Sequence, residues 1–431
     1  MNALKMNRRA AAHDYTRAGI YHVTLHVAEE MGQPFGRVVG DGSAPDGSPD
    51  APRIQLSAVG RMVEHELLHS IHDYYPMITV QDYVVMPDHL HFLVEVQDKI
   101  LSRQGKTLPL GQVIAGFKKG CNKRFWALTD QPAAAPDSGD TGGQTAAHTA
   151  GQAGNGADTS GNAAGSVQAG APGALPRPNK TPSNGSTGRP PLFAYGYCDV
   201  MPVDAAQLAT QRQYIKDNPR SRLLRSQNRA WLSPRRGTIA TALTVTALRG
   251  YLRRECPPSL ATDEALSAIE GQLLIAEGEP TATHTAAKTA ALIACDSYGN
   301  TGLLTEHRCL PVVCHRKDKA LFAQQKARCL DEAARGTVLV SPRIAKGEQE
   351  VIDDCVNHGF PVILIADNGF PDRYHPSAKR ITLCSGGRLL LITPWQYQYR
   401  GKNEQVTVPF CKTMNCVAQA LCRMKDSWWK E

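Results

Sequence analysis

The sequence predicts a mixed α/β protein with two folded units. Its 431 residues are more than a single domain usually contains. Residues 21–126 switch between strand and helix patterns, as judged from the spacing of their apolar side chains. From Tyr298 onward, short apolar runs alternate with a helix pattern, which is typical of βαβ units and indicates a parallel sheet.

Composition limits the class of protein. The chain carries 48 Lys and Arg against 40 Asp and Glu, a formal net charge of +8, which permits a polyanionic partner without requiring one. Its 12 cysteines are scattered, so we expect reduced thiols. The longest apolar runs, residues 361–366 and 389–393, are far shorter than the ~20 residues needed to cross a bilayer. We therefore expect a soluble cytoplasmic protein with no membrane partner.

The first unit begins with a strand at residues 21–27, where apolar odd positions alternate with polar even positions. A helix is expected at 56–72, and two strands at 77–96, separated by Pro87 and Asp88. A second helix at 108–126 has an apolar stripe and an opposite basic face. That face carries Lys118, Lys119, Lys123 and Arg124.

Residues 132–190 consist of small and polar residues that cannot bury a core, which predicts a disordered insertion. A helix then begins at Asp204, where residues 204–207 have capping-box spacing, and is expected to end at Pro219. Residues 238–285 are expected to form a helical connector. The second unit, residues 286–431, has expected strands at 337–341, 361–366 and 389–393 and a helix at 347–358.

A pair of histidines stands out on the strand that follows Asp88. Period-two geometry places His89 and His91 on the face opposite the apolar core positions, so two imidazoles project side by side. This arrangement suits the binding of a divalent cation, and the alternative is two solvated surface histidines. His22 and His26 share a strand face and are rival ligands, although their spacing along the strand is wide for one ion.

The helix after Asp204 carries a tyrosine on its polar side. Gln207, Gln211, Tyr214 and Asn218 fall at helical spacings and share one stripe, which leaves the tyrosine hydroxyl available for chemistry. Ordinary packing of an amphipathic tyrosine is the alternative. Arginines that include Arg220, Arg222 and Arg225 follow, and such clusters bind phosphates or form a solvated basic face.

Two motifs together resemble a known family. Residues 84–91, Val-Val-Met-Pro-Asp-His-Leu-His, and residues 214–219, Tyr-Ile-Lys-Asp-Asn-Pro, resemble the HUH single-tyrosine transposases, most closely the REP-associated tyrosine transposases. The resemblance runs from about Arg9 to Gly237, apart from the insertion. It implies that residues 1–237 form an HUH nuclease domain with an antiparallel, ferredoxin-like sheet.

The resemblance also implies a chemistry. His89, His91 and Asn218 would bind Mg²⁺ or Mn²⁺, and Tyr214 would attack a DNA phosphate to give a 5′-phosphotyrosyl enzyme and a free 3′-hydroxyl. The substrate would be single-stranded or hairpin DNA at repeats, in the bacterial cytoplasm and nucleoid. Expected DNA contacts are Lys118, Lys119, Lys123, Arg124, Arg220, Arg222 and Arg225. The long insertion also allows a homodimer in which the tyrosine helix serves the partner subunit.

The second unit looks Rossmann-like, and residues 338–395 are loosely similar to the DNA-processing protein A family. Residues 341–347 are a candidate phosphate-binding turn. A pocket is expected at the carboxyl ends of the strands, near Ser341, Asp367, Asn368 and Thr393. We expect an accessory DNA-binding role, with no organic cofactor.

Three functional hypotheses follow. The leading one is an active tyrosine nuclease or transposase, because the two histidines, the tyrosine and the asparagine are all present. The second is a DNA-binding regulator that keeps the fold and does not cleave. The third is a nucleotide-dependent enzyme in the second unit, which the first unit delivers to DNA.

Overall fold

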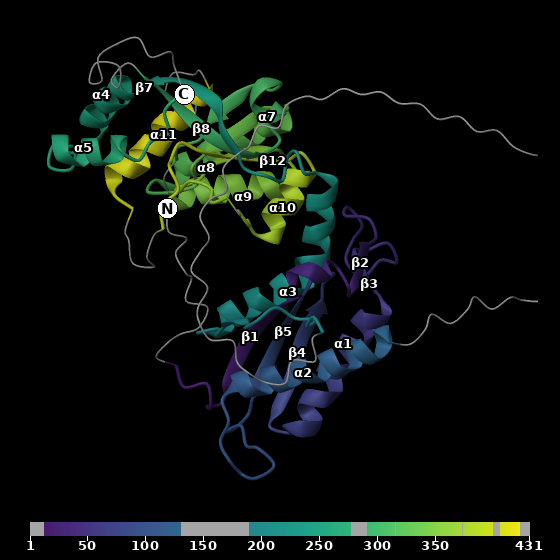
Figure 1. Cartoon of the computed structure of the whole chain (residues 1–431). Coiled ribbons are helices and arrows are strands. Elements are labelled where there is room, and N and C mark those ends of the chain that lie inside the picture. The colour runs from purple at the N-terminus through teal and green to yellow at the C-terminus, as the bar shows by residue number, and fades with distance from the viewer. Residues whose placement is uncertain are drawn as a thin grey trace, which may run out of the picture.

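The computed structural model describes residues 13–130, 189–276, 291–314, 316–372, 374–399 and 406–422. These residues form a mixed α/β protein with a four-stranded sheet, a six-stranded sheet and a two-stranded hairpin, as Figure 1 shows. The predicted disordered insertion, apart from its last two residues, lies outside the described residues.

The first unit contains ten elements. In chain order they are β1 (Gly19–His26), the short 3-10 helix η1 (Glu29–Met31), β2 (Gly36–Val39), β3 (Arg53–Leu56), α1 (Ala58–Tyr74), β4 (Ile78–Val85), β5 (His89–Val96), α2 (Leu110–Thr129), β6 (Cys198–Val200) and α3 (Ala205–Gln227).

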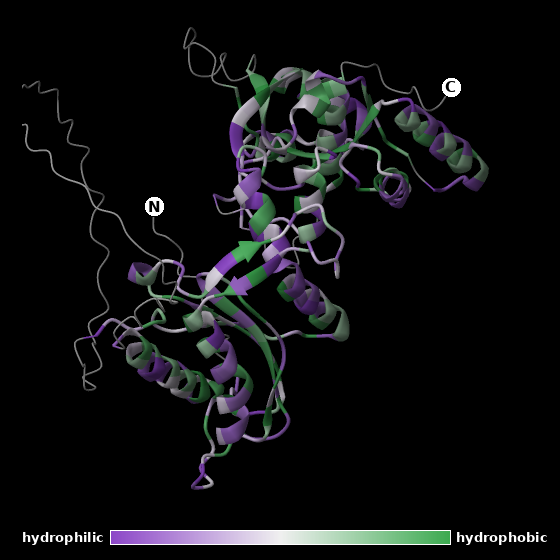
Figure 2. Ribbon diagram, turned by 90° about the vertical axis from the view of Figure 1, so that its right-hand side faces the viewer, coloured by the Kyte–Doolittle hydropathy of each residue, from purple (hydrophilic) through white to green (hydrophobic). Residues whose placement is uncertain are grey.

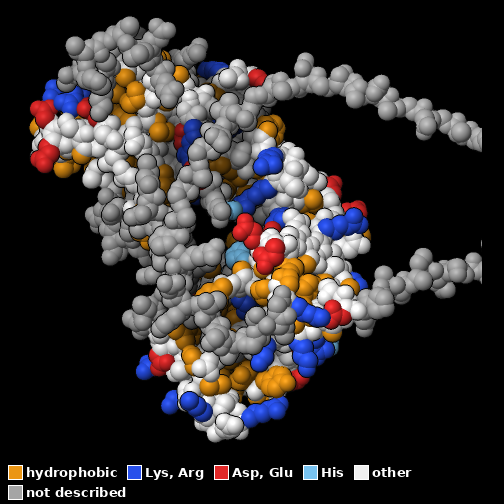
Figure 3. All heavy atoms as spheres, viewed as in Figure 1, with side chains coloured by type: hydrophobic (Ala, Val, Ile, Leu, Met, Phe, Trp, Pro, Cys, Tyr) orange, Lys and Arg blue, Asp and Glu red, His pale blue; other side chains and the backbone are white. Residues whose placement is uncertain are grey.

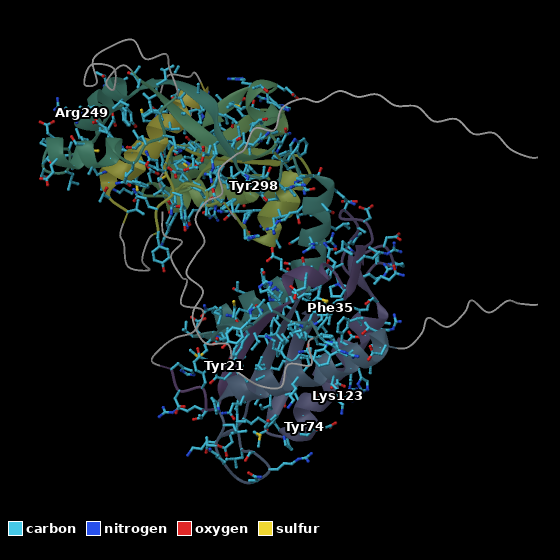
Figure 4. The ribbon with its side chains drawn as sticks, in the orientation of Figure 1. Tyr21, Phe35, Tyr74, Lys123, Arg249 and Tyr298 are labelled. Carbon is cyan, nitrogen blue, oxygen red and sulfur yellow. The ribbon has the colours of Figure 1, made fainter. Side chains whose placement is uncertain are left out.

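The four-stranded sheet has the order β4-β5-β1-β6, and each neighbouring pair is antiparallel. Alternate residues of β1 and β5 are buried in the core that α1 and α2 cover, among them Val23, Leu25, Leu90 and Phe92. The core also holds Phe35, which Figure 4 marks. The predicted strands and helices of residues 21–126 are therefore confirmed, because period-two burial is the dominant constraint on them.

The helix α3 packs on the other face of this sheet, against β4 and β5. Asp204 caps it as predicted, since its side chain accepts a hydrogen bond from the Gln207 backbone N–H at 2.7 Å. The predicted end at Pro219 is wrong, because the helix continues to Gln227. Pro219, Leu223 and Leu224 are buried, and this tertiary packing outweighs the backbone hydrogen bond that proline lacks.

The described residues of the second unit form thirteen elements. The first twelve of those described are β7 (Arg235–Thr244), α4 (Val245–Glu255), α5 (Asp263–Glu270), β8 (Leu292–Gly299), α7 (Gly302–Thr305), β9 (Cys309–Pro311), α8 (Lys319–Ala334), β10 (Val338–Ser341), α9 (Lys346–Asn357), β11 (Val362–Ile365), α10 (Ala378–Ser385) and β12 (Leu389–Thr393). The last described element is α11 (Val408–Cys422).

The six-stranded sheet has the order β7-β8-β12-β11-β10-β9. The strands β9 to β12 are parallel, as the βαβ rhythm predicts, and β8 and β7 continue the sheet in antiparallel fashion. Apolar residues of α8, α9 and α10 join the core on one face, and those of α4, α5 and α11 join the core on the other. Figure 2 shows hydrophobic residues concentrated along the strands between these helices.

The expected helical connector is wrong in its first part. Residues 235–244 form β7, an edge strand of the six-stranded sheet, and α4 and α5 pack into the core of that sheet. The error has a physical reason: Thr238, Ile239, Thr241 and Thr244 lie in a stretch whose alternation is recognisable only once β8 is known to pair with it.

Candidate metal and tyrosine site

Four histidines from β1 and β5 share the sheet face that α3 covers. The antiparallel register places His26 opposite His89 and Thr24 opposite His91, and His22 lies one pair further along. The ring centroids of His89 and His91 are 4.8 Å apart, those of His22 and His91 5.2 Å, and those of His26 and His89 5.7 Å. Figure 3 shows histidine side chains that reach the surface in the hollow between the two units.

The two histidines of the predicted pair are both held through Nδ1. His89 Nδ1 lies 2.6 Å from Asp88 Oδ1, and because an ionised carboxylate only accepts, His89 donates from Nδ1. His91 Nδ1 lies 2.9 Å from Thr24 Oγ1 and 3.3 Å from His22 Nε2. Nε2 is therefore the ring nitrogen that each histidine can offer to a metal, in the arrangement by which outer partners usually orient metal-bound imidazoles.

The structure brings Tyr214 to these histidines. Its ring centroid lies 5.2 Å from that of His91, with the two planes at 85°, and 6.0 Å from that of His22. The side chain is 50% exposed, so one part of the ring packs against the imidazoles and the other part faces solvent. This arrangement occurs within one chain.

Asn218 lies one helical turn after Tyr214. Its side-chain nitrogen donates to the Tyr214 carbonyl at 3.1 Å, so its amide oxygen is turned away from the helix backbone. One turn further, Arg222 reaches Asp88, the residue before His89. Along α3, Asn218 thus lies between Tyr214, whose ring contacts His91 on β5, and Arg222, which binds Asp88 just before β5. Gln211, one turn before Tyr214, is buried, and its Oε1 has no hydrogen-bond partner in the part of the chain that the structure describes.

The donor set fits a divalent metal ion only with an amide oxygen included. Among the described residues, no three His, Cys, Asp or Glu side chains converge on a point that could hold a metal. The two Nε2 atoms of His89 and His91 therefore need a donor of another type. The resemblance assigns that place to Asn218 on the facing helix, and two imidazoles with an amide oxygen would suit Mn²⁺ somewhat better than Mg²⁺.

Burial keeps the inner histidines neutral. It lowers the pKa of His22 to about 4. Burial, followed by the neighbouring imidazoles, also lowers the pKa of His91 well below 6.5. Partial burial acts to raise the pKa of Asp88, but hydrogen bonds from His89 and Arg222 outweigh it and lower that pKa. Neutral imidazoles beside an ionised carboxylate are the protonation states that metal binding requires.

A loss of stability in mild acid follows from His22. Its pKa falls from 6.5 to about 4 on folding, so between these pH values the unfolded chain binds the proton and the folded chain does not. The free energy of unfolding should therefore decrease as the pH falls below 6.5, by about 2 kcal/mol at about pH 5 from His22 alone.

Urea unfolding in chelator-containing buffer at about pH 7 and about pH 5 measures this effect. His22→Gln should reduce the difference between the two pH values, and His65→Gln, at an exposed position, should leave it unchanged. An equal pH dependence in wild type and His22→Gln would contradict the account.

Several of the predicted DNA-contacting residues are engaged inside the protein. The Lys118 ammonium donates to the carbonyls of Ala194 and Gly196, and burial lowers its pKa to about 8. Arg220 donates to the carbonyls of Gly42 and Ala44 and to the carboxylate of Asp46, and Arg222 donates to Asp88. Lys118, Arg220 and Arg222 thus have partners within the fold, and Arg225 stays a predicted DNA contact.

The other predicted residues, Lys119, Lys123 and Arg124, line a groove of about 1420 Å³ between α1 and α2. Arg124 forms an ion pair with Glu66 at 2.7 Å, while Lys119 and Lys123 are exposed. Aromatic side chains lie in the same groove, including Tyr74 and Trp126. Figure 4 marks Lys123 and Tyr74 on this part of the first unit. The α1 and α2 helices cover the face of the sheet opposite the histidines.

The carboxyl ends of β10 and β11 border a cavity of about 290 Å³. Asp367 lines it as predicted, whereas Ser341 and Thr393 are fully buried and the Asn368 side chain is bound to the backbone of residues 369 and 398. In the candidate phosphate-binding turn, the backbone donors already have a partner in the chain. Glu348 accepts hydrogen bonds from the Ile344 and Ala345 N–H groups at 2.7 and 3.1 Å. These donors are not free for a phosphate.

Comparison with known proteins found no matching family model, no similar curated protein and no similar solved structure. Among the described residues, no helix is both long and apolar enough to cross a membrane. None of the 12 cysteines, all of which lie in the described residues, forms a disulfide bond.

The sequence analysis missed three residues of the site: Thr24, Asp88 and the contact role of Arg222. Their roles depend on the register between β1 and β5 and on the docking of α3. The adjacency of Asp88 to His89 is the one signal visible in the sequence, because a carboxylate next to a metal-bound histidine is a common partner.

Proposed function

We propose that the chain is a metal-dependent tyrosine nuclease or transposase that cleaves and rejoins single-stranded or hairpin DNA. One observation carries the proposal: Tyr214, which resides on a helix far along the chain, lies 5.2 Å ring to ring from His91, and His91 lies 4.8 Å from His89. A half-exposed phenol beside two imidazoles with free Nε2 atoms is suited to attack a phosphate held at a metal.

The chemistry assigned to the residues is a phosphoryl transfer. The Tyr214 oxygen forms a bond to phosphorus while the bond from phosphorus to the 3′ oxygen breaks, and the phenol proton leaves to solvent or a nearby base. The 5′ phosphate stays on the tyrosine and the leaving strand ends in a 3′-hydroxyl. A divalent ion held by His89, His91 and Asn218 would supply charge neutralisation at the phosphate. Reversal of the same step rejoins DNA without ATP.

The groove between α1 and α2 lies on the sheet face opposite Tyr214, so it supports contact with a part of the nucleic acid away from the reacting phosphate. Two exposed lysines, Lys119 and Lys123, and the rings of Tyr74 and Trp126 offer ammonium groups for phosphates and aromatic faces for bases. We therefore include Lys119 and Lys123 in the DNA-binding surface. In the second unit, Glu348 already accepts the backbone hydrogen bonds of the candidate phosphate-binding turn, which argues against a phosphate-binding role for that turn.

Formation of a covalent adduct tests the proposal. The full chain, incubated with a set of hairpin-bearing oligonucleotides and Mn²⁺, should yield a protein–DNA species that survives denaturing electrophoresis. The adduct should retain a label on the 3′ side of the cut and lose a label on the 5′ side. Chelation with EDTA should prevent it. Binding of these oligonucleotides without any adduct would instead support a non-cleaving DNA-binding regulator.

A further inference from the structure

We infer that Arg222 is a positioning residue that joins the tyrosine helix to the metal strand through Asp88. The inference rests on the proposed function and adds two residues to which the resemblance assigns no role. Arg222 Nη1 donates to both carboxylate oxygens of Asp88, at 3.0 and 2.8 Å. The same carboxylate accepts from His89 Nδ1 at 2.6 Å. One carboxylate therefore connects α3 to the ring of a metal ligand.

The geometry gives this connection two effects. First, the carboxylate holds the His89 ring in the tautomer and orientation that leave Nε2 for the metal. Second, Arg222 lies two turns after Tyr214 on α3. Its ion pair with Asp88 therefore fixes the position of the helix on the sheet. The guanidinium and the carboxylate are each about one third exposed, at 32% and 33%, so solvent screens the pair only in part.

The rest of α3 strengthens the second effect. Beyond Arg222, the helix enters the second unit, where Leu224 belongs to the core with Tyr298 and Phe370, and α3 packs on α10. Asn228 donates to Ser385 Oγ at 2.7 Å. Figure 1 shows α3 running from the four-stranded sheet toward α10. The tyrosine helix is thus fixed at both ends within one chain, which favours a site completed in cis over one that a partner subunit completes.

A neighbouring ion pair provides a matched control. Arg212 also lies on α3 and also binds the four-stranded sheet, with its Nε 3.0 Å from Asp82 on β4. Neither Arg212 nor Asp82 has a hydrogen bond to a histidine among the described residues. Arg212→Ala therefore removes a contact between helix and sheet and leaves the orientation of His89 unchanged.

Mn²⁺ binding by titration calorimetry on the full chain tests the inference without DNA. Asp88→Ala should weaken Mn²⁺ binding about 10- to 100-fold, which is the usual effect of removing an outer partner of a metal-bound histidine. Asp88→Asn keeps the shape and one acceptor and should fall between this variant and wild type. Arg212→Ala should bind as wild type does. Circular dichroism melting verifies that each variant is folded.

The two effects separate when adduct formation is measured at saturating Mn²⁺. Asp88→Asn should recover more of the wild-type rate than Arg222→Ala, because excess metal compensates for a poorly oriented ligand and the remaining amide oxygen can still accept from Arg222. Arg222→Ala should stay at least about tenfold slower, because metal cannot restore the position of the helix. Arg222→Lys should recover only part of the rate, since ammonium lacks the planar fork of guanidinium.

Each outcome has one meaning. Equal Mn²⁺ affinity in wild type, Asp88→Ala and Asp88→Asn would overturn the inference while leaving the proposed function intact. A wild-type chain that binds Mn²⁺ through Asp88-dependent histidines yet never forms an adduct would overturn the proposed function and leave the positioning role of Asp88. A wild-type chain that binds no Mn²⁺ would overturn both.

Discussion

Tyr214→Phe should reduce formation of the covalent protein–DNA adduct by at least about 1000-fold, which is the scale of effect expected when a nucleophile is removed. The substitution deletes only the hydroxyl oxygen and keeps the ring that packs on His91 and His22. Because the side chain is half exposed, the free energy of unfolding should change by less than about 0.5 kcal/mol. The loss would therefore report chemistry and not stability.

Single-turnover assays with a labelled hairpin oligonucleotide measure this rate. Tyr195→Phe is the control, because Tyr195 is 94% exposed and no role is assigned to it. DNA affinity should be the same in all three proteins. Adduct formation at the wild-type rate by Tyr214→Phe would show that a different group attacks the phosphate.

Replacement of both predicted metal ligands, His89→Ala with His91→Ala, should abolish measurable Mn²⁺ binding and with it the adduct. An amide oxygen alone cannot hold the ion once both imidazoles are gone. His91 is buried beside His22, so its loss also opens a small cavity, and some decrease in melting temperature is expected.

A control separates metal loss from misfolding. His358 lies in the second unit, at the C-terminal end of α9, where its Nδ1 lies 2.7 Å from the Asp354 carbonyl oxygen. His358→Ala should retain Mn²⁺ affinity and adduct formation. DNA binding by the double variant should persist, since the exposed lysines of the groove are untouched. Full Mn²⁺ affinity in the double variant would place the metal elsewhere.

Local patterns in the sequence were sufficient for much of the first unit. The alternation around Val23 and Leu90 predicts strands whose apolar side is buried, and the structure confirms them. The capping residue Asp204 also begins its helix as predicted. These features depend on interactions within a few residues, or on burial of one face, and both leave a direct trace in the sequence.

The predictions fail where packing between residues far apart in the sequence determines the structure. Pro219 remains inside α3 because its neighbours are buried against two units. Arg220 appears as part of a basic cluster in the sequence, yet the fold gives it internal acceptors at Gly42, Ala44 and Asp46. The sequence shows which charges are present, but not which acceptors the chain brings to them.

The candidate site was predicted from the sequence only in part. Its histidine pair and its tyrosine were predicted by residue number, because period-two and helical spacing place them on polar faces. The roles of Thr24, Asp88 and Arg222 follow only from the register of β1 with β5 and the docking of α3. His22 and His26 were predicted to lie too far apart for one ion, and each neighbours a different member of the pair.

The most direct test is to identify the residue that becomes attached to DNA. The adduct would be digested with protease and nuclease, and the modified peptide sequenced by mass spectrometry. The account predicts a nucleotide joined through its 5′ phosphate to Tyr214, in a reaction that requires Mn²⁺ or Mg²⁺. Attachment to any other residue, or through a 3′ phosphate, would contradict it.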